Sequence, residues 1–290
     1  MSDAPGMVAA VSRNDAYTFT KPNRDAIELV AGLGVEGDVH AGVHVRHRSR
    51  VRADPTQPNL RQVHLIQEEL FAEVAEKGYD VPAGGLGENV TTRGLNLLGM
   101  PPGTILRFGP PATERAAGAE TGRVAESGLG AETGLGAETG PDGETGPDGE
   151  TGPDGETGPD GERAPGGGEG RGKGSQDGMA VLRGVLAAAG AASLDEATAR
   201  AVAAVAAAAG RDAGDDPRPA VVLAGLRNPC VQINGFRSGL LKEVLTQDAA
   251  GNVVRKAGVM AVVLRGGVIH PGDPVAVELP PGPHAPLERV

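Results

Sequence analysis

The sequence of 290 residues contains no tryptophan, a single cysteine and only six aromatic residues. One cysteine cannot form a disulfide within the chain, which excludes a disulfide-stapled fold and is typical of a reducing compartment. No apolar run approaches the roughly 20 residues of a membrane-spanning helix. The N-terminus also lacks the basic segment and sustained apolar core of a signal peptide. We therefore expect a cytoplasmic protein that does not associate with membrane.

The middle of the chain lacks the bulky residues that a core needs. Every aromatic residue, every histidine and the cysteine lie before residue 111 or after residue 219. Residues 111–219 carry 20 Asp and Glu against 9 Lys and Arg, whereas the rest of the chain carries 18 of each sign. The flanks are therefore neutral, and they lack the basic excess that indicates a nucleic-acid-binding protein.

A repeat of Gly-Pro-Asp-Gly-Glu-Thr occupies residues 140–163 and places glycine at every third position from Gly140 to Gly161. This period is typical of collagen. However, proline occupies only alternate triplets, and each hexapeptide carries two carboxylates. We predict a solvated, self-repelling flexible segment instead of a triple helix.

An alanine-rich stretch, 179–210, follows the repeat. Ser193 and Glu196 have the spacing of a capping box and Gly210 is placed as a stop signal, which predicts a helix over about 194–209. Its apolar residues are nearly all alanine and valine, so we expect weak docking. Residues 111–219 are thus interpreted as a tethered spacer whose removal leaves folding nearly unchanged. The predicted domain comprises 1–110 and 220–290.

Both flanks contain short runs of strand-forming residues separated by Gly, Pro, Asn and Asp. The predicted strands cover 26–30, 63–66, 104–109, 220–224, 253–255, 259–264 and 275–279. Because 104–109 and 220–224 border the insert, we predict that they pair as a hairpin opened at its tip. Helices are predicted at about 67–77 and from Ser238 onward. The predicted fold class is mainly β (α+β), a barrel-like domain with peripheral helices and a long low-complexity insertion.

Cys230 follows the predicted strand at 220–224, in the string GLRNPCVQ (225–232). A thiol at a strand exit, beside a cation and two turn-forming residues, is suited to act as a reactive thiolate or a metal ligand. Most free cysteines are instead small buried hydrophobic residues. Position alone therefore favours a packed thiol.

Asp38 and His40 lie two residues apart in GDVHAG (37–42), hence on one side of an extended backbone. Such a pair can orient a histidine for acid–base work or metal ligation. A turn held by the Asp38 side chain is the simpler alternative. His64 has apolar neighbours and is interpreted as a structural histidine. The histidines and the cysteine do not show the spacing of a closed zinc site.

Four arginines alternate with other residues over 46–52. If this segment is extended, they form a cationic stripe suited to phosphate or carboxylate oxygens, to which Arg61 and Arg227 could add. A solvated strand edge blunted by charge is the equal alternative.

The string GGLGENVTTRGL (84–95) is rich in glycine and short polar residues. Closely spaced glycines free backbone amides to approach a ligand, and Asn89, Thr91 and Thr92 supply polar groups. The string lacks the Gly-Lys-Ser or Gly-Lys-Thr ending of a nucleotide-binding phosphate loop, which disfavours an ATPase. A tight turn between strands is the alternative interpretation.

Six strings, taken in order, resemble the MOSC domain, which occurs at the C-terminus of molybdenum cofactor sulfurases and in stand-alone bacterial relatives. They are GDVHAG (37–42), LRQVHLI (60–66), GGLGENVTTRGLNLL (84–98), MPPGTILRFG (100–109), GLRNPCVQI (225–233) and KAGVMAVVLRGG (256–267). The resemblance covers about 7–109 and 218–290 and omits the insert. It implies a MOSC-type β-barrel-like fold that binds the molybdenum cofactor (molybdopterin).

The resemblance also implies roles for particular residues. The matching cysteine, Cys230, becomes the molybdenum ligand or sulfur carrier, and Asp38 and His40 join it as catalytic candidates. A soft thiolate suits molybdenum, and arginines suit the pterin phosphate. Chemistry and motif membership together assign cofactor binding to Arg46, Arg48, Arg61, Asn89, Thr91, Thr92, Arg227 and Asn228.

The sequence has no room for the pyridoxal-phosphate desulfurase domain of the family's sulfurases, and it is most similar to the short stand-alone bacterial members. Some of these reduce N-hydroxylated bases with electrons from a partner. We therefore expect a molybdoenzyme that acts on a small-molecule substrate and is served by a separate electron-donor reductase. A non-catalytic cofactor carrier or sulfur-relay module is the first alternative, and a redox-inert domain with a packed cysteine is the second.

Overall fold

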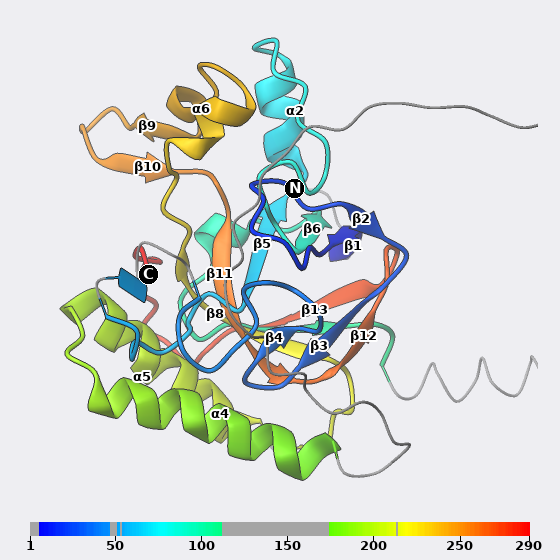
Figure 1. Ribbon diagram of the computed structural model, residues 1–290, viewed down its shortest axis with the longest axis vertical. Helices are drawn as coiled ribbons and strands as arrows, with labels where there is room; N and C mark the ends of the chain where they lie inside the picture. The colour runs from blue at the N-terminus through cyan, green and yellow to red at the C-terminus, as the bar shows by residue number, and fades with distance from the viewer. Residues whose placement is uncertain (1–5, 47–50, 53, 112–173, 213) are drawn as a thin grey trace, which may run out of the picture.

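The computed structural model describes residues 6–46, 51–52, 54–111, 174–212 and 214–290. Seven strands close into a barrel at its centre (Figure 1), in the order β13-β7-β8-β11-β5-β6-β1, and β1 pairs with β13 to complete the ring. All these neighbours are antiparallel except β5 and β6. The strands are β1 (Gly6–Ser12), β5 (Val63–Gln67), β6 (Val90–Arg93), β7 (Ile105–Phe108), β8 (Ala220–Leu226), β11 (Val259–Arg265) and β13 (Pro274–Glu278).

The predicted hairpin on either side of the insert is confirmed. β7 pairs with β8 in antiparallel register, with Ile105 opposite Val222 and Arg107 opposite Ala220. The barrel is therefore continuous across a gap of more than 100 residues in the sequence. Its interior is filled by aliphatic side chains from alternate positions of the strands, among them Val8, Leu65, Leu106 and Leu223.

Further short strands lie outside the ring of barrel strands. They are β2 (Asn23–Arg24), β3 (Ile27–Val30), β4 (Gly34–Val35), β9 (Leu245–Gln247), β10 (Val253–Arg255) and β12 (Gly267–Ile269). β2 pairs with β1, β3 lies between β12 and β4, and β9 pairs with β10. The sequence analysis missed β1 and β6, and the latter lies inside the glycine-rich string.

Short helices lie around the barrel, and α2 and α6 lie at one end of it (Figure 1). They are α2 (Glu69–Ala75), α6 (Gln232–Phe236), α7 (Leu241–Val244) and the 3-10 turn η1 (Leu97–Gly99). The predicted helix at 67–77 is confirmed as α2, which buries Leu70 and Val74. The helix expected from Ser238 is only one turn long, because the chain enters β9 at Leu245.

The alanine-rich stretch forms two helices, α4 (Gly174–Ala191) and α5 (Glu196–Arg211), where the sequence analysis predicted one. The cap of α5 is also different, because the side chain of Asp195, not Ser193, accepts a hydrogen bond from the Thr198 amide. α5 continues through Gly210 to Arg211, so this glycine does not end the helix.

The expectation of weak docking is wrong for these two helices. Leu182 and Val185 of α4 and Val205 of α5 are at most 1% exposed. They belong to a cluster with the outward-facing side chains of β8 and β11, including Val222 and Val262. Strands that are buried on both faces have continuous apolar sequences. The apolar runs at 220–224 and 259–264 therefore need other elements to pack on their outer faces. α4 and α5 supply this packing along one side of the barrel (Figure 1).

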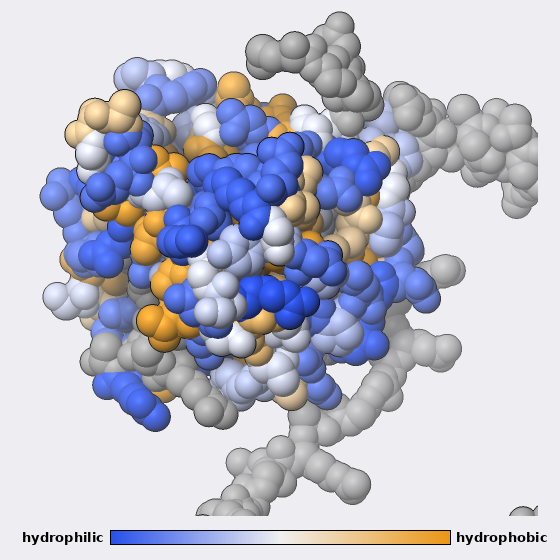
Figure 2. Space-filling view, turned by 90° about the horizontal axis from the view of Figure 1, so that it is seen from above, coloured by the Kyte–Doolittle hydropathy of each residue, from blue (hydrophilic) through white to orange (hydrophobic). Residues whose placement is uncertain are grey.

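The acidic repeat at 140–163 lies outside the described residues, so its predicted flexibility stays a prediction. Within the described ranges, none of the helices combines the length and apolar character needed to cross a membrane. Hydrophilic residues cover most of the face shown in Figure 2, and hydrophobic ones form small separate patches.

Candidate functional site

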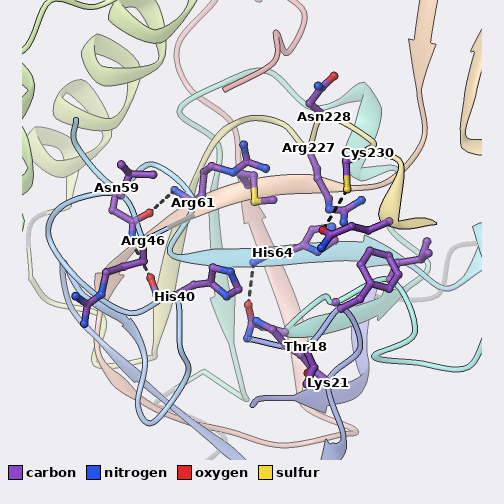
Figure 3. Close-up of a pocket in the computed structure, with 17 residues that line it drawn as sticks. Thr18, Lys21, His40, Arg46, Asn59, Arg61, His64, Arg227, Asn228 and Cys230 are labelled. Atoms are coloured by element: carbon purple, nitrogen blue, oxygen red, sulfur yellow. Dashed lines mark hydrogen bonds between the residues drawn. The ribbon is translucent and has the colours of Figure 1, made fainter. Parts of the chain in front are cut away.

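A cavity of about 240 Å³ opens beside the exit of β8 and is lined by seventeen residues from both flanks of the chain (Figure 3). Among these described residues, four are cationic, namely Lys21, Arg46, Arg61 and Arg227, and none is Asp or Glu, although the buried Asp38 behind the lining balances the charge of Lys21. Low-dielectric walls that carry charge of one sign concentrate the field in a cleft. The cavity is therefore suited to an anionic ligand.

Cys230 lies in the loop between β8 and α6 and lines this cavity. It is half-buried, and its thiol donates a hydrogen bond of 3.5 Å to Oε1 of Gln232. The packed-thiol alternative does not describe this position, because the sulfur faces the cavity and not the apolar core (Figure 3). The geometry leaves the thiol accessible to a ligand.

Arg227, three residues earlier, is only 8% exposed, and its Nη1 is buried without a hydrogen-bond partner. Its guanidinium carbon lies 5.9 Å from the centre of the Phe19 ring. Burial lowers the pKa of Arg227, although the charges of Cys230 and Glu88 oppose this shift. A buried cation with an unpaired donor is costly, so an anion in the cavity would relieve that cost.

Asp38 contacts both the backbone and the ring of His40. Oδ1 of Asp38 accepts hydrogen bonds from the backbone amide of His40 at 3.0 Å and lies 3.2 Å from its ring Nδ1. The aspartate thus holds a turn and also orients the imidazole. His40 lines the cavity, and its ring Nδ1 is directed at Asp38, so the imidazole has a defined orientation there.

The other oxygen of Asp38 is bound by Lys21, which the sequence analysis did not single out. Lys21 Nζ lies 2.7 Å from Oδ2 of Asp38, and both side chains are at most 4% exposed. Burial alone would raise the pKa of Asp38, but the hydrogen bond from His40 and the Lys21 charge hold it well below its usual range. Burial lowers the pKa of Lys21 against the opposing effect of Asp38.

The glycine-rich string forms a turn and does not offer amides to a ligand. The buried carboxylate of Glu88 accepts hydrogen bonds from the amides of Gly84 and Leu86, and the hydroxyl of Thr91 lies 3.3 Å from it. The Thr92 hydroxyl donates to the carbonyl of Ile66. Both threonines are at most 1% exposed and neither lines the cavity, so their predicted cofactor contact is wrong.

Asn89 lines the cavity but acts mainly as a buried connector. Its Nδ2 donates to the carbonyl of Ser12 at 3.1 Å and to Oδ2 of Asp38 at 2.9 Å, and its Oδ1 accepts from the amide of His64. A single carboxamide therefore joins β1, β5 and the Asp38 turn. This role explains why the position requires both a donor and an acceptor.

The remaining predicted cofactor residues differ in placement. Arg46 is exposed at the cavity rim, where its Nε donates to the carbonyl of Ala41. Arg61 donates from Nη1 to the carbonyl of Val290 at 3.1 Å. Asn228 lies at the edge of the cavity, and its Oδ1 accepts from Nε of Arg255 (Figure 3).

Arg48 lies outside the described residues, as does Arg50 of the predicted stripe. The short segment 51–52 is helical, so an extended stripe does not reach Arg52. Lining residues that the sequence analysis missed include Asn59, whose Nδ2 donates to the carbonyls of His40 and Gly42. Its only sequence signal was its position next to the string LRQVHLI.

His64 is confirmed as a hydrogen-bonded structural histidine, although it also borders the cavity. Its Nε2 lies 2.7 Å from the carbonyl of Ala257, and the residue is 5% exposed. Burial and the Arg227 charge lower its pKa well below 6.5. The imidazole is therefore neutral in the folded state.

This neutral histidine predicts a pH effect on stability. Below about pH 6.5 the unfolded chain binds a proton at His64 that the folded chain refuses, so the free energy of unfolding should fall by up to about 1.4 kcal/mol per pH unit through this group. In His64→Gln, which keeps a donor for Ala257, that contribution should vanish. Urea unfolding between pH 7 and pH 5.5 checks this, with exposed His270→Gln as the control. Equal slopes for wild type and His64→Gln would contradict it.

Across the described part of the chain, no group of three or more His, Cys, Asp or Glu side chains is placed to hold a metal ion. A metal at Cys230 would therefore need most of its ligands from a bound molecule. This requirement differs from that of a structural zinc site, where the protein supplies four ligands.

No model of a known protein family matches the chain, and no curated protein matches it. Similar solved structures include the YuaD protein of Bacillus subtilis, with a TM-score of 0.49 and 14% identity over 96% of this chain and 98% of that chain. YiiM from Geobacillus stearothermophilus has a TM-score of 0.42 and 13% identity over 94% of this chain and 75% of that one. YiiM from Escherichia coli has a TM-score of 0.40 and 12% identity, over 96% and 72%.

Proposed function

We propose that this chain is a MOSC-domain protein that binds the molybdenum cofactor and reduces N-hydroxylated small molecules. In this proposal a separate reductase supplies the electrons. The protein is located in the cytoplasm, whose reducing conditions keep a half-buried thiol from being oxidised. The observation that carries the proposal is the juxtaposition in one cavity of the accessible Cys230 thiol and the buried, incompletely paired Arg227 guanidinium.

The cavity residues fit an anionic metal–pterin group. Arg227 presents a buried donor without a partner among the described residues, and Arg46 and Arg61 add positive charge, whereas the charge of Lys21 is balanced by Asp38. Phosphate oxygens are well matched to guanidinium donors. Cys230 supplies one soft ligand, which suits molybdenum, while the remaining ligands would belong to the cofactor. When bound, the cofactor supplies the two-electron chemistry that accepts oxygen from a substrate.

The chain's own residues have to manage protons. Reduction of an N-hydroxyl group to an amine consumes two electrons and two protons and releases one water molecule. His40 is the candidate donor, because it lines the cavity and Asp38 orients its ring through Nδ1. The Lys21–Asp38 ion pair holds the aspartate charged, so that it keeps this orientation.

The test is cofactor content after expression in a host that makes the molybdenum cofactor. We expect the native chain to carry molybdenum and pterin. The molybdenum content of Cys230→Ser should be at least about tenfold lower, because one direct ligand is removed. Val231→Ala, at the neighbouring 78% exposed residue, is the matched control and should keep it. Metal-free native protein from such a host would refute the proposal.

Turnover then separates an enzyme from a carrier. The loaded protein is assayed with an N-hydroxylated base and an artificial electron donor. His40→Gln should lower kcat by about 10²-fold or more while cofactor content stays constant, as expected for loss of a general acid. Bound cofactor without turnover over a broad substrate panel would favour the carrier or sulfur-relay function.

A further inference from the structure

A second hollow adjoins the cavity and is not used by the cofactor residues above. It encloses about 330 Å³, is open to solvent, and is lined by Phe19, Thr20, Gln232, Gly235 and Phe236. We call it the aromatic groove. It shares Phe19 and Gln232 with the cationic cavity, and none of its lining side chains is charged.

Two aromatic rings define the groove. The centroids of Phe19 and Phe236 lie 5.9 Å apart with their planes tilted by 41°. Both rings are half-buried and pack against the apolar cluster that includes Leu86, Ile233 and Leu240. Because the rings are held from beneath, the groove does not have to be ordered by its ligand, which lowers the cost of binding.

Gln232 connects the groove to Cys230. It lines both hollows, and its Oε1 accepts the hydrogen bond from the Cys230 thiol at 3.5 Å. A ligand in the groove therefore lies beside a residue that contacts the thiol. Aromatic rings prefer offset or tilted contacts with other π-systems, which the 41° tilt offers.

The two hollows differ in the charge of their described lining residues. The cavity lining includes four cations, and the groove lining includes none, although a guanidinium group lies over each of its two rings. Arg227 lies 5.9 Å from the Phe19 centroid, and Arg237 lies 4.6 Å from the Phe236 centroid. A positively charged ligand would be repelled from this region, and an anion would be drawn into the cavity instead.

We propose that the aromatic groove is the substrate subsite and that it binds the uncharged planar ring of the substrate, with the reacting group directed to Cys230. The role of the reacting group rests on the proposed function, whereas binding of the ring depends only on Phe19, Phe236 and the open space above Gly235. A Cβ added at Gly235 would meet no atom within 4 Å. This glycine therefore keeps the groove free.

The test uses the metal-free full chain and the fluorescent purine 2-aminopurine as an uncharged planar probe. The chain has no tryptophan, so the probe is observed without protein background. We expect saturable quenching with a Kd on the order of 1 mM, because the open groove leaves part of the ring in water. Gly235→Leu should fill the groove and weaken binding by at least about tenfold, or 1.4 kcal/mol.

Gly210→Leu is the matched control. Gly210 is also a helical glycine, and a Cβ added there likewise meets no atom within 4 Å, but it lies in α5 away from the groove. Its binding should stay within about twofold of wild type. Absence of quenching, or equal Kd values for Gly235→Leu and wild type, would overturn the assignment. The assay contains no molybdenum, so its failure is separate from a failure of the proposed function.

Discussion

Deletion of residues 174–212, which form α4 and α5, should unfold the barrel domain. The deletion removes Leu182, Val185 and Val205, each at most 1% exposed, whose burial is worth about 1.5–3 kcal/mol apiece. It also exposes the outer apolar face of β8 and β11 to water. The loss approaches the 5–15 kcal/mol that stabilises a typical domain.

The deletion is practicable because β7 and β8 are paired neighbours, with Arg107 opposite Ala220. Residues 109–173 and 213–219 remain in this variant and connect the two strands. Deletion of 116–170 alone, which removes the acidic repeat, should shift the melting temperature by less than about 2 °C, because this sequence has few core-forming side chains. Thermal melts followed by circular dichroism measure both variants.

Point substitutions give the same test without changing chain length. Val205→Asp introduces a buried unpaired charge on α5 and should be severely destabilising, by more than about 4 kcal/mol. Ala206→Asp, on the exposed side of the same helix, should change stability by less than about 0.5 kcal/mol. Equal melting temperatures for the two variants would show that α5 is a tethered spacer after all.

Substitution of Arg227 by methionine should separate stability from function. The apo protein should be as stable as wild type or more stable, by about 1–3 kcal/mol, because an incompletely paired buried cation is replaced by an apolar side chain of similar length. Arg227 is 8% exposed, and its Nη1 has no partner. Natural binding sites commonly carry such a cost.

Cofactor binding should move in the opposite direction. Loss of the buried cation should weaken binding of the anionic cofactor by about 2–5 kcal/mol, which is at least about 30-fold in affinity. Arg24→Met, at an exposed position of β2, is the control and should leave both properties unchanged. An Arg227→Met protein that is destabilised and retains full molybdenum content would show that Arg227 has a structural role only.

Local patterns were enough to predict the barrel strands that alternate or run apolar. The strand-forming runs at 63–66, 104–109, 220–224 and 259–264 correspond to β5, β7, β8 and β11. β6 was missed because it begins three residues after the last of three closely spaced glycines, whose turn signal outweighed the short β-branched run at Val90–Arg93. Strand pairing, not local propensity, specifies β6.

The sequence analysis predicted some residues of the candidate site and missed others. Cys230 and Arg227 lie in one short loop, so a motif finds both. Lys21 reaches the site only because its backbone amide donates to the carbonyl of Gly84 and its side chain pairs with Asp38. Thr91 and Thr92 share the motif of Asn89 but face away from the cavity, because a buried strand divides its side chains between two packed surfaces.

The sequence by itself determined that the chain has a single thiol, that the insert and the flanks differ in charge, and that a hairpin is interrupted at its tip, since each depends on residue identity or on neighbours along the chain. Only the tertiary structure decided that α4 and α5 cover the barrel, that Glu88 occupies the amides of the glycine-rich turn, and that four cations line the same cavity as Cys230. These features depend on which side chains face each other after strands distant in sequence have paired. The spacing of residues along the chain does not specify these contacts.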